Sequence, residues 1–219
     1  MAQRSMYELL NGANSAGNPD LALNAANSDF VLAKQRFVWD FTPIRGDSTD
    51  AWTEDNNTGT WAMSSDGIKG TITSGQNTNA MIHFGDKMPF DATSSIFIAS
   101  VKAVNTDHSS HWFRCGFGGT SYTSNSSLFS AHSQNTNFEF YQNSGVSINT
   151  GVPRDENFHT VKIENTSSSA ILSIDGSLRV TDTANLSTGK QQPIFQLWRA
   201  YNTDPSPECY IRYVECYNT

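Results

Sequence analysis

The stretch FHTVKIENTSSSAILSIDGSLRV, residues 158–180, decides the fold that we expect for this chain. Its first part alternates apolar and polar side chains, with Val161 and Ile163 on one face, which is the period of a half-buried strand. After a polar turn rich in serine, Leu172 and Ile174 repeat the alternation. The stretch therefore predicts two neighbouring strands joined by a polar turn.

A second turn follows directly. Asp175 and Gly176 form a strong two-residue hairpin signal, because glycine tolerates the positive φ that a type I′ turn requires. A third short strand is expected at residues 178–180, so the whole stretch is predicted to be a three-stranded meander. The rest of the chain can be interpreted as further strands added around this meander.

The same two-residue period recurs from Phe37 to the end of the chain, between turns rich in Asn, Ser, Gly and Pro. In residues 95–103 both faces are apolar, which is typical of a central strand, whereas residues 52–59 are expected to form a polar loop. About fourteen short strands with regularly spaced turns predict an all-β antiparallel sandwich of two large sheets. The other expected strands lie at residues 37–41, 61–63, 68–73, 80–84, 111–119, around 129 and 138–141, 146–148, 193–201 and 210–217.

Composition supports one folded domain. The chain has 219 residues, enough to bury a core, and its thirteen Phe, seven Tyr and five Trp exclude a disordered chain. Its many Ser, Thr and Asn side chains compete for backbone hydrogen bonds and disfavour long helices. The net charge of −7 and the pI of about 5.1 argue against a surface for nucleic acid or anionic membranes.

The cysteines and the termini indicate where the chain folds. Cys115, Cys209 and Cys216 are too few, and odd in number, for a disulfide framework, so we expect reduced thiols in or near the core. No run approaches the ~20 apolar residues of a membrane span. Residues 1–7 lack the apolar segment of a secretory signal. We therefore expect synthesis and folding in a cytoplasm, without membrane insertion.

Residues 1–36 differ from the rest and carry most of the helical signal. Apolar side chains recur there at alternating spacings of three and four, the a/d pattern of a helical seam. The seam consists of Leu23, Ala26, Phe30, Ala33 and Phe37. Two heptads suit either a helix packed on its own sandwich or an arm that docks on a neighbouring subunit. We adopt the second interpretation, a partly helical assembly arm at 1–36 before a sandwich at 37–219.

The order of these features resembles the concanavalin A-like lectin/glucanase superfamily in its laminin-G-like form. Three segments carry the resemblance, which covers residues 37–219: NFHTVKIE at 157–164, ILSIDG at 171–176 and the final strand YIRYVE at 210–215. The resemblance implies a jelly-roll sandwich of two curved sheets whose last strand returns beside the first. It leaves the activity open, because this fold carries lectins, hydrolases, lyases and structural domains.

Motifs for catalysis on this fold are missing from the sequence. A retaining glucanase needs two carboxylates about 5–5.5 Å apart, and the family signature Glu-x-Asp-x-x-Glu does not occur. The Gly-x-Ser-x-Gly motif of serine hydrolases does not occur either. A lyase would gather Gln142, His159, Gln196 and Arg199 on one sheet, but scattered polar residues on strands are usually a solvated face. We therefore expect a protein that is not an enzyme.

Evidence for a metal is limited to what the resemblance implies. Laminin-G-like domains often hold Ca²⁺ through aspartates at one rim, and the candidate oxygen ligands are Asp91, Asp107 and Asp175. His108 and His111 lie near Asp107, without an evident fourth ligand for zinc. We expect no cofactor, with Ca²⁺ as the one metal for which candidate ligands exist.

Aromatic residues near loops are the strongest candidates for ligand binding. Their flat apolar faces match the C–H face of a sugar, while Asn, Gln and Asp bind its hydroxyl groups. The alternative is that most of the tryptophans fill the core or cap the ends of the sandwich. The candidate glycan-binding residues are Trp52, Asn56, Trp61, Trp112, Tyr122, Asn125, Trp198 and Tyr201.

A lectin-like fold usually works outside cells, whereas this chain has features of cytoplasmic folding. A virion protein satisfies both, because it is made in host cytoplasm and then works outside. We therefore expect a non-enzymatic virion structural protein of a virus or bacteriophage (a capsid decoration, head-fibre or tail-associated subunit) that displays a lectin-like domain to host-surface glycans. Its expected partners are capsid or tail proteins through the arm, further copies of itself as a trimer, and glycans. The alternatives are a cellular carbohydrate-binding module or lectin and, after it, a polysaccharide lyase or hydrolase.

Overall fold

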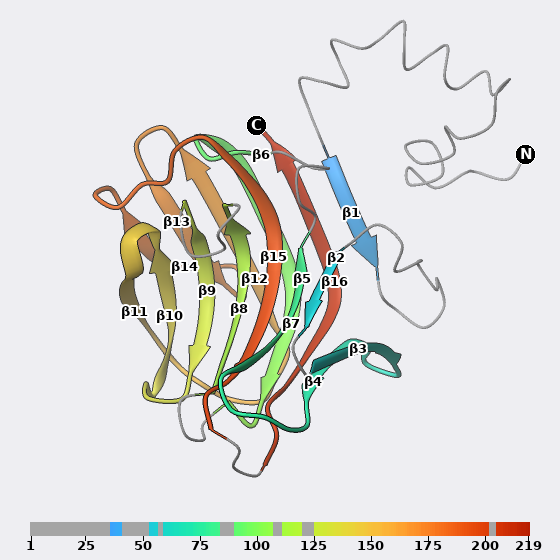
Figure 1. Cartoon of the computed structure of the whole chain (residues 1–219). Helices are drawn as coiled ribbons and strands as arrows, with labels where there is room; N and C mark the ends of the chain where they lie inside the picture. Colours follow the sequence, from blue (N-terminus) through green and yellow to red (C-terminus); the bar gives the residue numbers. More distant parts are fainter. Residues whose placement is uncertain are drawn as a thin grey trace, which may run out of the picture.

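The computed structural model of the chain describes residues 36–40, 53–56, 59–83, 90–106, 111–119, 125–201 and 205–219. These residues form an antiparallel sandwich of two sheets, which confirms the expected all-β fold (Figure 1). In these ranges no helix has the length and hydropathy needed to cross a membrane.

Each sheet contains eight strands in the described chain. Sheet A has the order β14-β13-β12-β7-β16-β4-β3, with β1 beside β16, and sheet B has the order β11-β10-β9-β8-β15-β5-β2, with β6 beside β15. The strands of sheet A are β1 (Arg36–Asp40), β3 (Gly59–Ser64), β4 (Gly67–Ile72), β7 (Ser94–Val104), β12 (His159–Thr166), β13 (Ala170–Ile174), β14 (Ser177–Asp182) and β16 (Glu208–Asn218). Those of sheet B are β2 (Thr53–Asn56), β5 (Thr78–His83), β6 (Phe90–Asp91), β8 (Trp112–Gly118), β9 (Ser127–His132), β10 (Asn137–Gln142), β11 (Val146–Pro153) and β15 (Lys190–Arg199).

The predicted meander is confirmed as β12, β13 and β14. Asp175 and Gly176 join β13 to β14 with φ angles of 52° and 74°, and two positive φ angles are what a type I′ turn requires. The meander lies at one edge of sheet A, however, and the middle of the sheet is β7 and β16. The strand at residues 95–103 is therefore central, as its two apolar faces predicted.

The last strand, β16, holds sheet A together. It pairs with β7 along its length, while its other edge pairs first with β4 and then with β1. A register shift between Ile211 and Tyr213, a β-bulge, marks this change of partner. The last strand thus returns beside the first described strand, as the resemblance implied.

The polar loop expected at residues 52–59 is wrong in part. Residues 53–56 form β2, which pairs with β5 at one edge of sheet B. An edge strand is paired on one side only and can be short and charged, so it lacks the apolar alternation by which a sequence reveals a strand. At the other edge, β11 extends to Pro153, where proline is tolerated for the same reason.

The core is an aromatic layer between the two sheets. Phe97 of β7 packs against Phe117 of β8 and Phe195 of β15, with ring centroids 5.8 Å apart in both pairs. All three rings are buried. These contacts join the central strand of sheet A to the middle of sheet B.

The three cysteines lie in this core as free thiols, which confirms the expectation. Cys115 comes from sheet B, and Cys209 and Cys216 come from sheet A. Burial raises the pKa of each thiol above its ordinary value. The thiols are therefore protonated at neutral pH and serve as small apolar core residues.

A histidine at the start of β12 ties the meander to the loop before it. Nδ1 of His159 lies 2.7 Å from Oδ2 of Asp175, and Nε2 lies 2.9 Å from Oδ1 of Asp155. The other carboxylate oxygen of Asp175 accepts the backbone N–H of Thr160 at 2.8 Å. Both ring nitrogens can donate only when the imidazole is protonated. Burial lowers the pKa of His159, but the hydrogen bonds to Asp175 and Asp155 outweigh it and raise the pKa from its ordinary value.

The leucines of the meander provide a matched test of the core. Leu172 is fully buried, whereas Leu178, one strand away, is 64 % exposed. Leu172→Ala should lower the free energy of unfolding by about 2–5 kcal/mol, because it leaves a cavity in the core. Leu178→Ala should change it by less than about 0.5 kcal/mol. Urea unfolding followed by fluorescence measures both, and equal losses would contradict this assignment of faces.

The His159 cluster predicts a pH-dependent contribution to stability. Because its pKa is raised on folding, the stabilisation is complete below the unfolded value of about 6.5 and is lost as the pH rises through the folded pKa. His159→Gln should therefore lower the free energy of unfolding at pH 6 by about 1 kcal/mol more than at pH 9, a value discounted for the solvent exposure of both aspartates. Chemical unfolding at the two pH values measures this, and a loss independent of pH would show that only packing against Phe138 matters.

Candidate functional site

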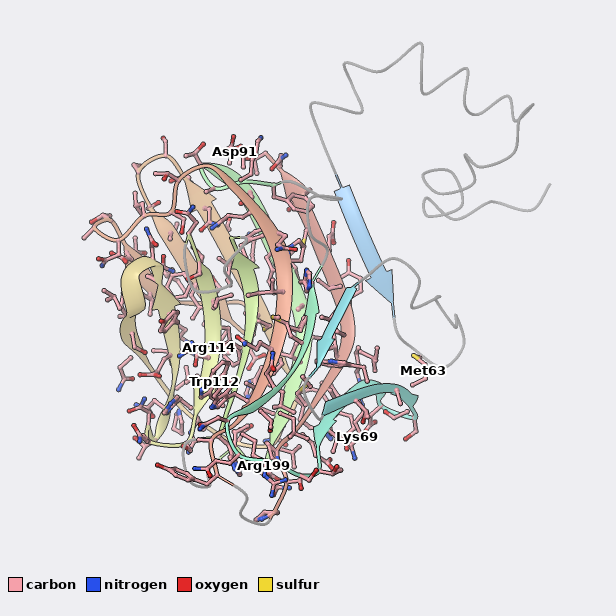
Figure 2. All side chains as sticks on the ribbon, in the orientation of Figure 1. Met63, Lys69, Asp91, Trp112, Arg114 and Arg199 are labelled. Atoms are coloured by element: carbon pink, nitrogen blue, oxygen red, sulfur yellow. The ribbon has the colours of Figure 1, made fainter. Side chains whose placement is uncertain are left out.

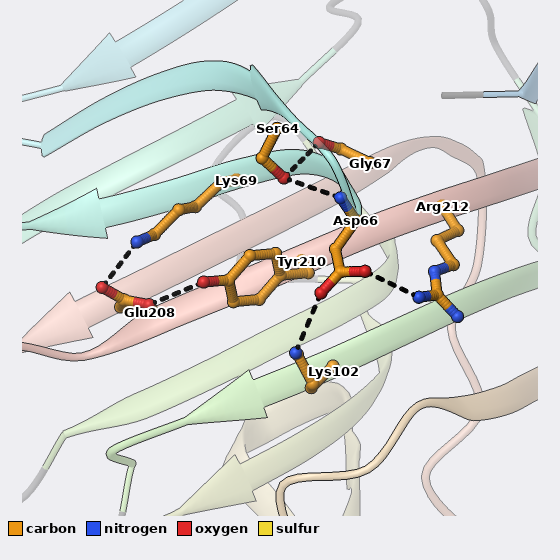
Figure 3. A network of polar contacts seen from close by, with 8 residues as sticks. All are labelled: Ser64, Asp66, Gly67, Lys69, Lys102, Glu208, Tyr210 and Arg212. Carbon is orange, nitrogen blue, oxygen red and sulfur yellow. Dashed lines mark hydrogen bonds and ion pairs between the residues drawn. The ribbon is translucent and has the colours of Figure 1, made fainter. Parts of the chain in front are cut away.

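The outer face of sheet A is covered by charges that satisfy one another. Lys69 pairs with Glu208 at 2.7 Å, and Asp66 pairs with Arg212 at 2.9 Å and with Lys102 at 3.5 Å (Figure 3). The hydrogen bond that Asp66 accepts from Arg212 is the largest cause of the lowered pKa of Asp66. These charged groups already have partners, so this face offers a ligand few groups with which to form ion pairs or hydrogen bonds.

Sheet B directs a different set of side chains outward. In β8, Phe113, Cys115 and Phe117 belong to the core. Because successive side chains of a strand point to opposite faces, Trp112 and Arg114 lie on the outer face. Figure 2 labels both on the strands of sheet B, away from the network of Figure 3.

Aromatic rings gather where β8 begins and β15 ends. Trp112 stands opposite Trp198 in the register, and their rings stack with centroids 5.7 Å apart and planes at 9°. The guanidinium carbon of Arg114 lies 4.3 Å from the ring centroid of Trp112 and 3.8 Å from that of Tyr141 in β10. The four side chains form a continuous stack from β15 to β10.

A polar row runs beside this stack. The registers place Gln196 opposite Arg114, Arg114 opposite Ser130, and Ser130 opposite Glu139. Nε of Arg114 donates to Oγ of Ser130 at a long 3.5 Å. Over the described ranges, the side chains of Gln196 and Glu139 form no hydrogen bond, and Glu139 forms no ion pair. Gln196 is 8 % exposed and Glu139 is half-buried, so the row carries polar groups without partners, of which Glu139 is the more accessible to a ligand.

Burial determines the electrostatics of this face. It lowers the pKa of the Arg114 guanidinium, an effect that Tyr141 and Glu139 oppose. Burial also lowers the pKa of His132, which stands opposite Trp112, and the charge of Arg114 lowers it further. His132 is therefore neutral at neutral pH, and Arg114 and Glu139 are the charged groups of the row.

We call these side chains the sheet B platform. Its members are Trp198, Trp112, Arg114, Tyr141, Gln196 and Glu139. All six come from β10, β8 and β15, which are joined through β9 into one paired sheet, so backbone hydrogen bonds hold the strands in place. The platform offers apolar ring surface beside hydrogen-bonding groups, a combination suited to a flat polar ligand.

The structure brings two of the predicted glycan-binding residues together, Trp112 and Trp198. Tyr201 follows β15 at the same end of the sheet and is 51 % exposed. Asn125 precedes β9 at the opposite end. Trp61 lies in β3 of sheet A and packs against the core.

Other predicted residues cannot be placed by their side chains. Asn56 lies in β2 and Phe37 in β1, which are described by their backbone pairing. Residues outside the described ranges are Trp52 and Tyr122 of the glycan set and Leu23, Ala26, Phe30 and Ala33 of the arm. The roles of all these residues, and the domain boundary at residue 37, stay predictions.

The candidate Ca²⁺ ligands lie apart. Asp91 lies beside the start of β7, where its carboxylate accepts hydrogen bonds from Thr93, the largest cause of its lowered pKa. Asp175 lies beside His159, which pairs with Val101 near the other end of β7. Asp107 is outside the described residues. No group of three His, Cys, Asp or Glu side chains in the described chain could hold a metal ion.

The four residues considered for a lyase are also separated. Gln196 belongs to the outer face of sheet B, whereas His159 belongs to sheet A. Gln142 is fully buried, and Arg199 is buried with its guanidinium bonded to the carbonyls of Ile72 and Tyr201. They do not form one polar cluster on a single face.

Sequence reasoning did not connect the rest of the platform to ligand binding. A signal for Arg114 was present, because it lies two residues after Trp112 and so shares its strand face. Glu139 and Tyr141 share a face by the same rule. The sequence did not reveal that β10 and β8 flank β9, which is what brings Tyr141 to Arg114.

No protein-family model matches the sequence, and no curated protein matches it. Solved structures do match the fold. Crh5 transglycosylase in complex with NAG has a TM-score of 0.62 at 16% identity, with 85% of each chain covered. The β-glucanase of Bacillus licheniformis has a TM-score of 0.59 at 15% identity, covering 84% of this chain and 98% of that one. The carbohydrate recognition domain of Emp47p has a TM-score of 0.58 at 11% identity, covering 85% and 95%.

Two of these structures are named as enzymes and one as a carbohydrate recognition domain, so the likeness leaves the activity of this chain open. At such low identity the likeness concerns the fold alone. The two-sheet jelly-roll sandwich of this protein is the concanavalin A-like lectin/glucanase fold.

Proposed function

We propose that this protein is a non-enzymatic carbohydrate-binding protein and that the sheet B platform is its glycan site. The observation that carries the proposal is the stacked pair of Trp112 and Trp198 on an outer sheet face, beside polar groups without partners. Apolar C–H groups of a sugar can contact the accessible surface of such rings, and its hydroxyl groups can bind to such a row. The likeness of the fold to a carbohydrate recognition domain agrees with this ligand class.

The platform is suited to binding because little must be ordered when a ligand arrives. Trp112 and Trp198 lie on directly paired strands, and each ring limits the movement of the other. Side chains that are ordered before binding lose less conformational entropy on complex formation. Gln196 and Glu139 then bind hydroxyl groups along the row.

The distribution of carboxylates supports binding without hydrolysis. Glu139 is the one carboxylate of the polar row. Asp55 lies in β2, five strand steps from β10, or about 24 Å at the usual spacing of paired strands. The two carboxylates of a glycosidase lie within about 9.5 Å of one another. In the part of the chain described, the platform therefore lacks the second carboxylate of that mechanism.

The same proposal includes display of the platform on a virion. The arm at residues 1–36 docks on capsid or tail proteins, and the seam from Leu23 to Phe37 is the sequence feature that supports it. Three free, buried thiols suit folding in a reducing cytoplasm before release. A cellular carbohydrate-binding module would use the same platform without the docking arm.

Loss of either ring of the stacked pair should weaken glycan binding. Trp112→Ala and Trp198→Ala should each weaken binding by about tenfold or more, because each removes an aromatic surface worth about 1.5 kcal/mol. Affinity electrophoresis in β-glucan, chitin, polygalacturonate and alginate measures the dissociation constants. Tyr210→Ala, which removes an aromatic ring from the outer face of sheet A, is the matched control and should leave binding unchanged.

Two outcomes would oppose this proposal. Wild-type protein that binds no polysaccharide of the panel would remove the carbohydrate-binding function. Release of reducing ends from a bound polysaccharide would show that the protein is an enzyme. Unfolding curves for each variant separate a lost site from a lost fold.

Deletion of residues 1–36 tests the docking arm. The shortened protein should stay folded and bind glycan, but it should be a monomer, whereas the full chain should be a trimer. Light scattering coupled to size-exclusion chromatography measures the mass of each. A shortened protein that no longer folds would show that the arm belongs to the sandwich, and one of unchanged mass would show that assembly does not use it.

A further inference from the structure

We propose that the sheet B platform recognises glycans that carry an anionic substituent, a carboxylate or a sulfate, and that Arg114 binds this substituent. This inference rests on the proposed function, because it names the class of glycan that the same platform takes. Four observations lead to it: the burial of Arg114, its lack of a counter-ion, its orientation between two rings and its neighbours along the polar row.

Arg114 differs from most other cations of the described surface, and Arg179, which also lacks a carboxylate partner among the described residues, is exposed and stays hydrated. Lys69, Lys102, Lys190 and Arg212 each pair with a carboxylate. Arg114 is half-buried and has no carboxylate within ion-pair distance in the described residues. A half-buried charge without a counter-ion has lost part of its hydration without a full replacement. An anionic group on a ligand would supply what is missing.

Two other buried or half-buried arginines, Arg199 and Arg154, show how backbone carbonyls satisfy a guanidinium in this fold. Arg199 donates to the carbonyls of Ile72 and Tyr201 at 3.1 Å each. Arg154 donates to the carbonyls of Asn135 and Thr106 at 2.6 and 3.0 Å. Arg114 has instead one long hydrogen bond to a serine hydroxyl and two aromatic neighbours, of which Tyr141 also favours its charge, as does the more distant Glu139.

The aromatic neighbours orient the guanidinium for a ligand on the platform. Trp112 and Tyr141 both lie within 4.3 Å of the Arg114 guanidinium carbon, measured to their ring centroids. A planar guanidinium held in this way presents donors in a fixed fork, which binds two oxygens of a carboxylate or sulfate together. A sugar ring that contacts the accessible surface of the Trp112–Trp198 pair would place its anionic substituent beside this fork.

The residues on either side of Arg114 in the polar row determine the orientation in which a glycan should bind. Gln196 lies directly opposite Arg114 on β15, and its side-chain amide can donate to the same anion. Glu139 lies two strands away on the other side, about 10 Å across the sheet. A carboxylate there repels an anion and accepts hydrogen bonds from hydroxyl groups. The bound glycan should therefore point its anionic group toward Gln196 and its hydroxyl groups toward Glu139.

Four matched pairs of ligands and a matched set of variants test the inference in the full chain. The ligands are polygalacturonate, alginate and hyaluronan, each compared with its carboxyl-reduced, neutral counterpart, and dextran sulfate compared with dextran. The proteins are the wild type, Arg114→Met, Arg114→Lys and the control Arg179→Met, which removes an exposed arginine from sheet A. Isothermal titration at low and high salt measures the dissociation constants.

We expect the wild type to bind at least one anionic polymer about tenfold or more tightly than its neutral counterpart, and less tightly at high salt. Arg114→Met should remove this preference, so that its dissociation constants for the anionic polymer and for the neutral counterpart become equal within about twofold. Arg114→Lys should restore it in part, because lysine keeps the charge without the planar fork. Arg179→Met should behave as the wild type. The polymer whose binding is weakened by Arg114→Met, carboxylated or sulfated, identifies which anion is the ligand.

Two results would overturn the inference, and they differ from failure of the proposed function. Equal affinity for the anionic and neutral polymers would show that the platform binds glycans without charge recognition. An anionic preference that Arg114→Met leaves intact would place the charge recognition at another residue. If the wild type binds none of the polymers and Trp112→Ala changes nothing, the carbohydrate-binding function itself is contradicted.

Discussion

The packing of one apolar sheet face against another is the constraint on which this structure depends. Phe97 meets Phe117 and Phe195 across the interior, and the meander supplies Leu172 from the edge of sheet A. Because side chains alternate along a strand, the choice of inward residues also determines the outward ones. The placement of Phe113 and Cys115 in the core is therefore the reason that Trp112 and Arg114 face solvent.

The two outward faces that result have different chemical characters. On sheet A, Lys69, Lys102 and Arg212 pair with carboxylates of β16 and of the turn between β3 and β4, so these charges already have partners. On sheet B, the charged and amide groups of the polar row lack such partners and lie beside stacked rings. A core that is equally apolar on both sides thus supports one inert face and one face equipped for a ligand.

Local sequence signals predicted the elements in which local physics dominates. Asp175-Gly176 forms its turn because two successive positive φ angles suit those residues, and β7 is central because both of its faces are apolar. The same rules failed for β2, where pairing with β5 outweighs a polar composition at the edge of the sheet. They also could not separate Trp61, which packs on the core, from Trp112, which stacks on Trp198, because alternation alone does not say which face of a strand is covered.

The sequence by itself determined the all-β class, the meander with its type I′ turn, the core placement of the thiols and the family of folds. Each of these follows from residue type and spacing along a few neighbouring positions. Only the tertiary structure decided which aromatic rings meet and which charges remain without partners. Arg114 and Tyr141 are 27 positions apart and come together because β9 lies between their strands. That contact depends on the order of strands in a sheet, which is set by long-range packing and leaves no mark in the local pattern.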